Sequence, residues 1–250
     1  MSVLPYTHIA PYYDTIFNHI HHRPWLRFIK RICRRYTVKP KHILDLGCGT
    51  GTLTALMARK YSHIYAIDRS AEMLTIAQQK YHRRNITWEC TSFNNLHYDI
   101  PIDMAVCINT SLNYCMTLNE LRSVFAAVRK TMHPRGIFIF DMSTENNIVE
   151  NFACREFHQT RNKYQTMWHG EYNTDTKIFT AHFTINTAHP ATNGSDRFIL
   201  HEKHPHRIFS KHEIISALSE KWHLIDAVGD FTFHPITVKT DLMFFIARPR

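Results

Sequence analysis

The chain of 250 residues lacks the features that would direct it into a membrane or out of the cell. No apolar stretch approaches the roughly 20 residues that a membrane-spanning helix needs, and residues 1–24 show no signal-peptide pattern. Its six cysteines include no C-x-x-C pair, and several fall in expected core strands. We therefore expect a reduced, cytoplasmic protein without a disulfide framework or a membrane partner. The 44% hydrophobic and 20% charged composition is typical of a soluble globular protein.

Acidic residues are scarce at the start of the chain. Residues 1–40 hold seven Lys/Arg and one acid, Asp14, so +6 of the net charge of +9 lies there. The basic residues recur at helical spacing opposite an apolar stripe, which predicts an amphipathic helix over about 24–36. A basic face can attract nucleic acid or an anionic membrane, although a solvated face is the simpler interpretation.

Histidine is abundant, but metal-site spacing is lacking. The 19 histidines include two clusters, at 19–22 and 201–206. Neither cluster has a carboxylate or cysteine at a spacing known for a metal site. No metal is therefore expected in the chemistry.

Glycine is rare, with seven in the chain, and three of them alternate within residues 43–54. An apolar run containing Asp45 ends there at Gly47, Gly49 and Gly51, and a helix-like segment follows. This order predicts a buried strand, a tight turn and a helix N-terminus. Glycine permits positive φ and lets a ligand approach the backbone where a Cβ would collide.

A second acid completes this signal. The apolar run 64–67 ends in Asp68, 21 positions after Gly47. In a doubly wound sheet this places a carboxylate at the tip of the neighbouring strand, within reach of a ribose diol. A dinucleotide fingerprint needs a glycine three residues after Gly49, where Thr52 stands. The pattern therefore favours a nucleoside-bearing cofactor other than a dinucleotide over a turn that binds nothing.

The remaining pattern predicts two kinds of sheet. Strands and helices alternate over residues 42–142, as in a parallel α/β sheet with right-handed crossovers. Residues 155–206 instead alternate apolar and polar side chains, which predicts an antiparallel, half-exposed sheet joined by a hairpin at Asn193-Gly194. The predicted strands are 42–46, 63–68, 86–90, 102–108, 137–142, 222–229 and 241–248, and the predicted helices are 6–17, 24–36, 50–60, 70–83, 118–132 and 210–220.

Several motifs in order resemble one enzyme family. They are Tyr6 with Tyr13-Asp14, the glycine loop, Asp68, Ser111-Leu112-Asn113-Tyr114, Pro134-Arg135-Gly136 and Phe138-Ile139-Phe140-Asp141. Together they resemble the small-molecule branch of class I S-adenosylmethionine-dependent methyltransferases, which includes sugar-amine N-methyltransferases. The resemblance implies a Rossmann-like, doubly wound, mostly parallel seven-stranded α/β sheet with an inserted antiparallel β subdomain. It implies an N-terminal helical cap at 1–40, a core at 41–150 and 207–250, and a substrate insertion at 151–206.

The same resemblance implies a cofactor site for S-adenosylmethionine, with S-adenosylhomocysteine as product and no metal. Asp45 would orient the glycine loop, Asp68 would accept from the ribose, and Tyr13 would close over the cofactor. Relatives often carry acids where this chain has Ser92 and Thr110, which puts the adenine contact and an acid-assisted amine mechanism in doubt. The implied cofactor-binding residues are Tyr13, Trp25, Asp45, Gly47, Gly49, Gly51, Asp68, Met73, Ser92, Phe93, Ile108 and Asn109, with core packing as the alternative for Tyr13 and Trp25.

Substrate contacts are expected from Thr110, Asn113 and the insertion. Leu200, Glu202 and His204 share one strand face by alternation. If that face points inward, Glu202 and His204 pair with each other or meet a substrate, because an unpaired buried charge is unfavourable. His204 is the one candidate catalytic base.

The predicted reaction is methyl transfer to a nitrogen or oxygen of a small molecule. A sulfonium methyl group is already activated, so the protein must mainly align the nucleophile and exclude water. A base matters only if the nucleophile arrives protonated. Two alternatives stay open: an RNA methyltransferase that uses the basic helix, and a non-catalytic binding protein with this fold. The sequence does not indicate an oligomeric state.

Overall fold

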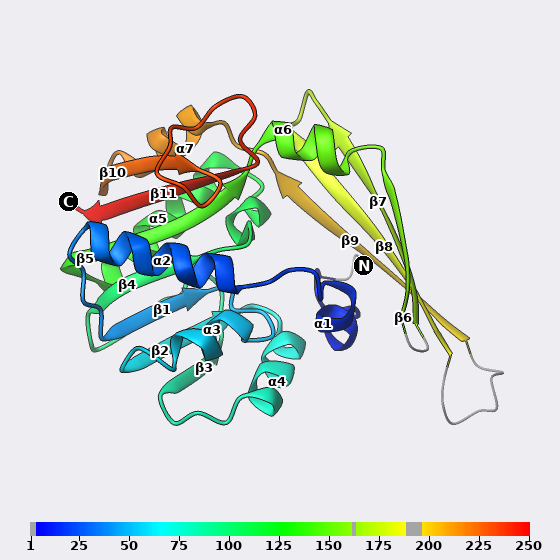
Figure 1. Ribbon diagram of the computed structural model, residues 1–250, viewed down its shortest axis with the longest axis horizontal. Helices are drawn as coiled ribbons and strands as arrows, with labels where there is room; N and C mark the ends of the chain where they lie inside the picture. Colours follow the sequence, from blue (N-terminus) through cyan, green and yellow to red (C-terminus); the bar gives the residue numbers. More distant parts are fainter. Residues whose placement is uncertain (1–3, 162–163, 189–196) are drawn as a thin grey trace.

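The computed structural model describes residues 4–161, 164–188 and 197–250, which form two sheets (Figure 1). Sheet A has seven strands in the order β10-β11-β5-β4-β1-β2-β3. Only β11 runs antiparallel to its neighbours, so the predicted mostly parallel α/β sheet is confirmed. Its strands are β1 (His42–Leu46), β2 (His63–Asp68), β3 (Ile86–Cys90), β4 (Ile102–Cys107), β5 (Met132–Ser143), β10 (Trp222–Gly229) and β11 (Leu242–Pro249).

Helices cover both faces of sheet A. The α2 helix (Arg23–Arg35) and α3 (Thr52–Met57) pack with one apolar cluster, and α5 (Leu118–Thr131) and α7 (Lys211–Leu218) pack with the other. Alternation in β1 explains this division, since Ile43 belongs to the first cluster and Leu44 to the second. The α4 helix (Ala71–Lys80) lies against β2 and β3, and its N-cap is Ser70, as predicted.

Sheet B consists of four antiparallel strands. They are β6 (Glu156–Arg161), β7 (Tyr164–Asn173), β8 (Ile178–Ala188) and β9 (Arg197–Arg207). One face buries Phe179, Ala181, Phe183 and Ile185 against the N-terminal segment, which confirms the predicted alternation. Figure 1 shows sheet B beyond the end of the core toward which β1 points, with α1 (Tyr13–Ile16) between them. The predicted turn at Asn193-Gly194 lies outside the described residues.

The division into a cap at 1–40, a core and an insertion at 151–206 is our proposed domain organisation. It is supported by the separate hydrogen bonding of β6–β9. Short elements connect the two sheets: the 3-10 helices η1 (Ala10–Tyr12) and η2 (Ser111–Tyr114), the α6 turn (Glu145–Asn147) and the π-helical turn η3 (Ile148–Phe152). Among the described residues, no helix combines the length and apolar character needed to cross a lipid bilayer.

Three predicted boundaries are wrong for local reasons. The single helix expected over 6–17 is only η1 and α1, because Tyr6 has a φ of 70°, which a helix cannot accommodate. The helix expected from residue 50 begins at Thr52, because Gly51 has a φ of 78°. Strand β5 begins at Met132 rather than 137, and its register with β4 shifts between the pairs Ile102–Met132 and Met104–Ile137. The intervening residues form a bulge.

Candidate functional site

The glycine loop turns at the carboxyl end of β1, beside the switch point where β2 and β4 flank it. The backbone N–H groups of Gly47 and Cys48 both donate to the carbonyl of Ile67, at 2.9 Å each. This contact holds the loop against the end of β2. Gly47, Gly49 and Gly51 all have positive φ, so the predicted need for glycine is met.

The three glycines face different surroundings. A Cβ at Gly49 would meet no atom within 4 Å, whereas a Cβ at Gly51 would lie 2.5 Å from the Trp88 ring. A Cβ at Gly47 would lie 2.8 Å from Ser111 Oγ. Gly49 therefore leaves room for a ligand, while Gly51 is needed for close packing of the loop against β3.

Asp68 joins the end of β2 to this loop. Its Oδ2 accepts from the Gly49 N–H at 2.8 Å and its Oδ1 from the Ser70 N–H at 2.9 Å. Burial raises the pKa of Asp68, and these two N–H donors partly oppose the shift. Each oxygen keeps a lone pair that could accept from a ribose hydroxyl.

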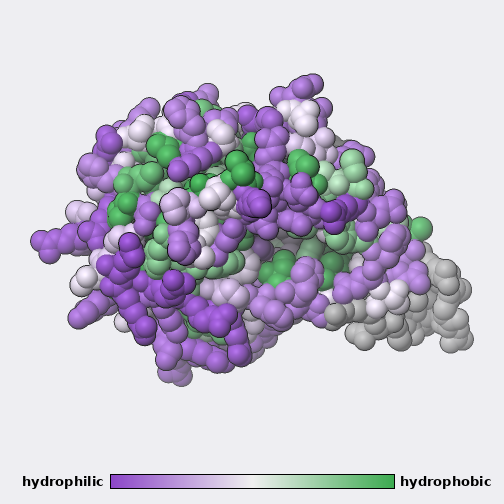
Figure 2. Space-filling model, turned by 45° about the horizontal axis from the view of Figure 1, so that its top comes forward, coloured by the Kyte–Doolittle hydropathy of each residue, from purple (hydrophilic) through white to green (hydrophobic). Residues whose placement is uncertain are grey.

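A cavity of about 230 Å³ opens over the loop and Asp68. Its walls come from the core, from η2 and from the N-terminal segment, which contributes Tyr6 and Tyr13. Figure 2 shows a mainly hydrophilic surface, with hydrophobic residues visible in the hollow between the core on the left and sheet B on the right. Most predicted cofactor residues line the cavity: Tyr13, Asp45, Gly47, Gly49, Asp68, Met73, Ser92, Phe93, Ile108 and Asn109.

Trp25 and Gly51 do not line this cavity. Trp25 is buried in α2, and its Nε1–H donates to Asp141 Oδ2 at 2.5 Å. Asp141, at the end of β5, also accepts from the backbone N–H of Asn109 at 3.0 Å and of Thr110 at 2.7 Å. Because Asn109 and Thr110 both have positive φ, Asp141 and Trp25 together fix a strained turn in the cavity wall.

Asp45 lies behind the loop and is almost fully buried. Its Oδ2 accepts from Thr54 Oγ1 in α3 at 2.5 Å. Burial raises the pKa of Asp45 to about 7, and burial likewise raises that of Asp141 to about 6. The predicted role of Asp45 in orienting the loop acquires a specific partner in Thr54.

The predicted substrate residues make hydrogen bonds within the protein. Asn113 is fully buried, donates from Nδ2 to the Arg207 carbonyl at 2.7 Å and accepts at Oδ1 from the Ser143 N–H at 3.0 Å. Glu202 accepts from the backbone N–H groups of Tyr6, His8 and Ile9. Thr110, Asn113 and Glu202 do not line the cavity among the described residues, so substrate contact by them stays a prediction.

His204 and Glu202 form the pair that alternation along β9 made possible. His204 Nε2 lies 2.9 Å from Glu202 Oε1, and both side chains are at most 2% exposed. His204 Nδ1 lies 2.7 Å from the Tyr114 hydroxyl, which lies 2.8 Å from the Tyr6 hydroxyl. A continuous hydrogen-bonded network thus runs from buried Glu202 to two tyrosines in the cavity wall.

Sequence reasoning missed Tyr6, Tyr114 and Arg69 as cavity residues. Tyr114 stands in the Ser-Leu-Asn-Tyr stretch, so its place after β4 was available as a signal. Tyr6 stands with Tyr13-Asp14 in the N-terminal motif, so it too carried a signal, whereas Arg69 had none. Arg69 follows Asp68 directly, and its guanidinium lies 5.4 Å from the centre of the Tyr114 ring.

Asp14 fastens the N-terminal segment to the glycine loop. Its Oδ1 accepts from Thr50 Oγ1 at 2.7 Å, and its Oδ2 forms an ion pair with Lys80 at 2.6 Å. With Glu202 holding residues 6–9, the segment over the cavity is attached both to sheet A and to sheet B.

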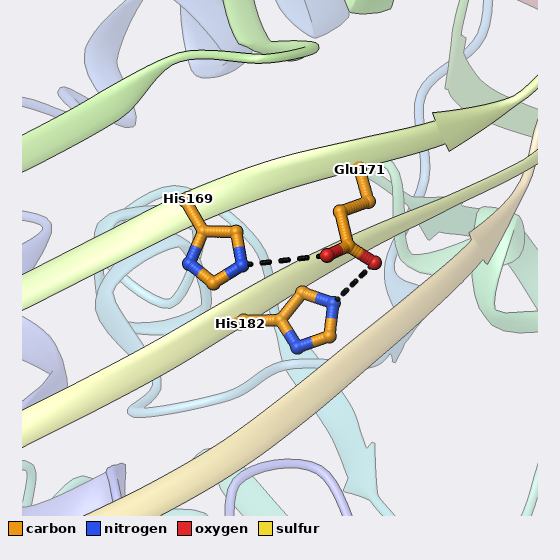
Figure 3. Close-up of side chains that lie close together, drawn as sticks. All are labelled: His169, Glu171 and His182. Atoms are coloured by element: carbon orange, nitrogen blue, oxygen red, sulfur yellow. Dashed lines mark hydrogen bonds and ion pairs between the residues drawn. The ribbon is translucent and has the colours of Figure 1, made fainter.

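Away from the cavity, His169, Glu171 and His182 gather on the outer face of sheet B (Figure 3). Among the described residues this is the group whose ligand atoms, all within 4.8 Å of one another, could hold a metal ion. The six cysteines all lie in the described part of the chain and are free thiols.

Comparisons with known proteins agree on the class. Residues 43–136 match the family described as "Methyltransferase domain". The chain is 28% identical to "Putative methyltransferase YqeM" of Bacillus subtilis (strain 168) in an alignment of length 257, which covers 97% of this chain and 96% of that protein.

Solved structures share the whole architecture. An S-adenosylmethionine-dependent methyltransferase from Clostridium acetobutylicum ATCC 824 has a TM-score of 0.82 at 22% identity, covering 97% of this chain and 98% of that chain. The sugar N-methyltransferase KedS8 from Streptoalloteichus sp ATCC 53650 has a TM-score of 0.78 at 13% identity, covering 94% and 92%. Residues 43–136 are therefore similar to a methyltransferase domain, and the chain has the fold of the S-adenosylmethionine-dependent methyltransferases, as the resemblance predicted.

Proposed function

We propose that this protein transfers the methyl group of S-adenosylmethionine to a nitrogen or oxygen of a small molecule. The observation that carries the proposal is the cavity, whose lining includes the glycine loop, Asp68 and three tyrosines, Tyr6, Tyr13 and Tyr114. The glycine loop and Asp68 suit a nucleoside with an amino-acid tail, and we place the acceptor beside Tyr6 and Tyr114.

The residues present fit the cofactor. The open space at Gly49 would admit a ligand to the backbone, and the free lone pairs of Asp68 suit a ribose diol. Met73, Ser92 and Phe93 line the part of the cavity nearest the ends of β2 and β3, where an adenine would lie. When bound, S-adenosylmethionine supplies an activated methyl group, so the protein's task is alignment and exclusion of water.

The first test is thermal unfolding of the protein with and without S-adenosylhomocysteine, with NAD as the control ligand. At about 100 times its dissociation constant a ligand stabilises the folded state by ~2.7 kcal/mol. For a chain of this size, the expected rise in Tm is roughly 5–10 °C. Stabilisation by NAD instead, or by neither compound, would contradict the proposed cofactor.

The contacts made by arginines of the basic helix α2 favour a small acceptor over RNA. Arg35 of α2 lies 4.5 Å from the centre of the Phe233 ring, and Arg31 lies 5.1 Å from the same ring. Arg31 also donates to the Phe231 carbonyl at 2.9 Å. Both arginine side chains are exposed, but their contacts with Phe231 and Phe233 restrict the directions in which the guanidinium groups can reach toward a phosphate backbone. RNA binding that weakens steeply with salt would favour the RNA alternative.

The free cysteines support a reducing, cytoplasmic location for this activity. Burial raises the pKa values of Cys33, Cys107 and Cys115 above that of an ordinary thiol. These thiols are therefore poor nucleophiles and serve as core side chains.

A further inference from the structure

The hydrogen-bonded network behind the cavity has the form of a proton path. Its four groups follow one another at 2.8 Å from Tyr6 to Tyr114, 2.7 Å from Tyr114 to His204 Nδ1 and 2.9 Å from His204 Nε2 to Glu202. Tyr6 and Tyr114 line the cavity, whereas His204 and Glu202 are buried behind them. The path therefore has an open end and a closed end.

At the buried end of the network, a proton taken up by His204 can be stabilised in an ion pair with Glu202. Burial raises the pKa of Glu202, but the hydrogen bonds from His204 and from the backbone N–H groups of His8 and Tyr6 outweigh it, so the pKa lies below the usual range. Glu202 therefore stays ionised and can stabilise an imidazolium at His204. The neighbouring His206 does not compete, because burial and the proximity of His204 lower its pKa to about 3.

The open end is held in place by the backbone. Tyr6 has a φ of 70°, a conformation that is unfavourable for a residue with a Cβ. Its backbone N–H donates to Glu202, the same carboxylate that ends the path. Strain at Tyr6 is thus offset by a contact that also aims its hydroxyl at Tyr114.

Resting on the proposed function, we propose that Tyr6, Tyr114 and His204 form a relay that removes a proton from an amine or hydroxyl acceptor. As the acceptor atom bonds the methyl carbon, the carbon–sulfur bond breaks and its electron pair stays on sulfur. The acceptor's proton passes to Tyr6, that of Tyr6 to Tyr114, and that of Tyr114 to His204 Nδ1. The resulting imidazolium pairs with Glu202 and returns its proton to solvent after product release. A carboxylate acceptor has no proton to lose and gains nothing from this relay.

The direct test is ¹⁵N NMR of the histidine side chains in the S-adenosylhomocysteine complex, with His204→Gln to assign the resonance. The expected state is an unprotonated Nδ1 that accepts from Tyr114 and a protonated Nε2 that donates to Glu202. A proton on Nδ1 in this complex would overturn the relay, because the site could not accept another. This readout needs no acceptor, and loss of S-adenosylhomocysteine binding would instead count against the proposed function.

Kinetics provide the second test. Tyr6→Phe and Tyr114→Phe should keep S-adenosylhomocysteine affinity within about threefold while slowing methyl transfer to amine and hydroxyl acceptors by about 10²–10⁴-fold. The matched control is Tyr172→Phe, which removes a sheet B hydroxyl that donates to Glu145 outside the cavity. Equal rates for Tyr6→Phe, Tyr114→Phe and the control would overturn the relay.

A separate observation concerns the outer face of sheet B. His169 of β7 and His182 of β8 are directly paired across the strands, and their rings stack at 4.7 Å with an angle of 1° between planes. Glu171 lies two residues along β7 on the same face, 3.6 Å from His169 and 3.1 Å from His182. Figure 3 shows both imidazoles turned toward the one carboxylate.

The geometry points to a site for a divalent transition-metal ion such as Zn²⁺ on these three side chains. Zinc takes two histidines and a carboxylate at about 2.0–2.2 Å from the ion, and the ligand atoms of these three side chains lie within 4.8 Å of one another, so rotation of the side chains would bring them around one ion. Glu156 stands opposite His169 and Lys203 opposite His182, so the nearby charges are balanced. Such an ion would cross-link β7 and β8 without contact with the cavity.

Calorimetric titration with ZnCl₂ tests this site in the full chain. We expect wild type and His201→Asn to bind one zinc ion alike, since His201 lies on the same face but contacts Thr184 instead. His182→Asn should bind at least tenfold more weakly. Equal affinity for His182→Asn and His201→Asn, or no binding to wild type at 100-fold excess over protein, would overturn the proposal.

Discussion

Asp45 of sheet A and Glu202 of sheet B are both buried near the cavity, and the two carboxylates are held in opposite ways. Asp45 in β1 accepts from the Thr54 hydroxyl, and burial raises its pKa to about 7. Glu202 in β9 accepts from three backbone N–H groups and from His204, and its pKa is lowered despite burial. Both are at most 3% exposed, so the opposite pKa shifts of this pair come from the different donors around each carboxylate and not from a difference in burial.

The contacts also differ in their reach along the chain. The cofactor side is built from neighbours, since Asp68 and Gly49 are 19 positions apart. The acceptor side joins Tyr6 to Glu202, which are 196 positions apart. Local sequence can therefore specify the first side, whereas the second exists only in the complete fold.

The largest expected effect is on the pH dependence of the free energy of unfolding, because folding raises the pKa of Asp45 and lowers that of Glu202. The pKa of Asp45 is raised by folding, so its contribution to stability is full below pH ~4 and is lost as pH rises toward 7. Wild type should lose up to about 4 kcal/mol of unfolding free energy through Asp45 as the pH rises, and Asp45→Asn should lack this part of the loss. Denaturant unfolding at pH 4 and pH 8 measures it, and Asp141, with a pKa of about 6, should keep part of the slope in the variant. An unchanged slope would mean that Asp45 stays ionised.

The next effect removes the other carboxylate. Glu202→Ala leaves the backbone donors of Tyr6, His8 and Ile9 without their acceptor, which should lower the free energy of unfolding by about 3 kcal/mol. Because the pKa of Glu202 is lowered by folding, the wild-type advantage should fade as pH drops through the acid range, the reverse of Asp45. Hydrogen exchange should show faster exchange at residues 6–9. Protection retained there would contradict the role of Glu202 as anchor.

A third prediction compares two glycines of one loop. Gly49→Ala and Gly51→Ala both place a Cβ at positive φ, but only the second collides with Trp88. Gly51→Ala should therefore be less stable than Gly49→Ala by about 2 kcal/mol. Gly49→Ala should instead lose S-adenosylhomocysteine affinity, measured by calorimetry. If both variants lose stability equally, the open space at Gly49 is not a ligand site.

The smallest expected effect concerns Asp68. Asp68→Asn keeps the shape but removes the charge that accepts from Gly49 and Ser70. We expect S-adenosylhomocysteine to bind about tenfold more weakly, corresponding to ~1.4 kcal/mol. The free protein should lose about 1 kcal/mol of stability, because the amide Nδ2 cannot accept from the second N–H. Unchanged affinity would place the ribose elsewhere.

The parts of the fold with strict periodicity could be predicted from sequence. The bounds of β1, β2 and β3 agree with the structure to the residue. For β1 and β2 the reason is the apolar run of a buried parallel strand, whereas β3 is an edge strand in which only Ile86 is buried. The start of β5 could not be predicted from the sequence, because the bulge before Ile137 depends on the register with β4. The segment 6–17 could not be read either, because its conformation is imposed by contacts with residue 202 and with Thr50.

The candidate site follows the same division. The spacing of the glycines and Asp68 predicts that they belong to the site, and both line the cavity. Trp25 has the right residue type, but its ring packs behind the wall and holds Asp141. Tyr6 and Tyr114 both stand in motifs of the resemblance, but their contact with His204 could not be predicted from sequence, because the fold brings the three residues together from distant parts of the chain.

The bond between Tyr6 and Glu202 has a consequence for biosynthesis. During translation the segment around Tyr6 leaves the ribosome early, yet its anchor in β9 is made nearly 200 residues later. The glycine loop can form as soon as β2 has emerged, whereas the roof of the cavity must wait for the last strand of sheet B. In a nascent chain, the loop of the proposed cofactor site would thus form before the wall that would enclose an acceptor.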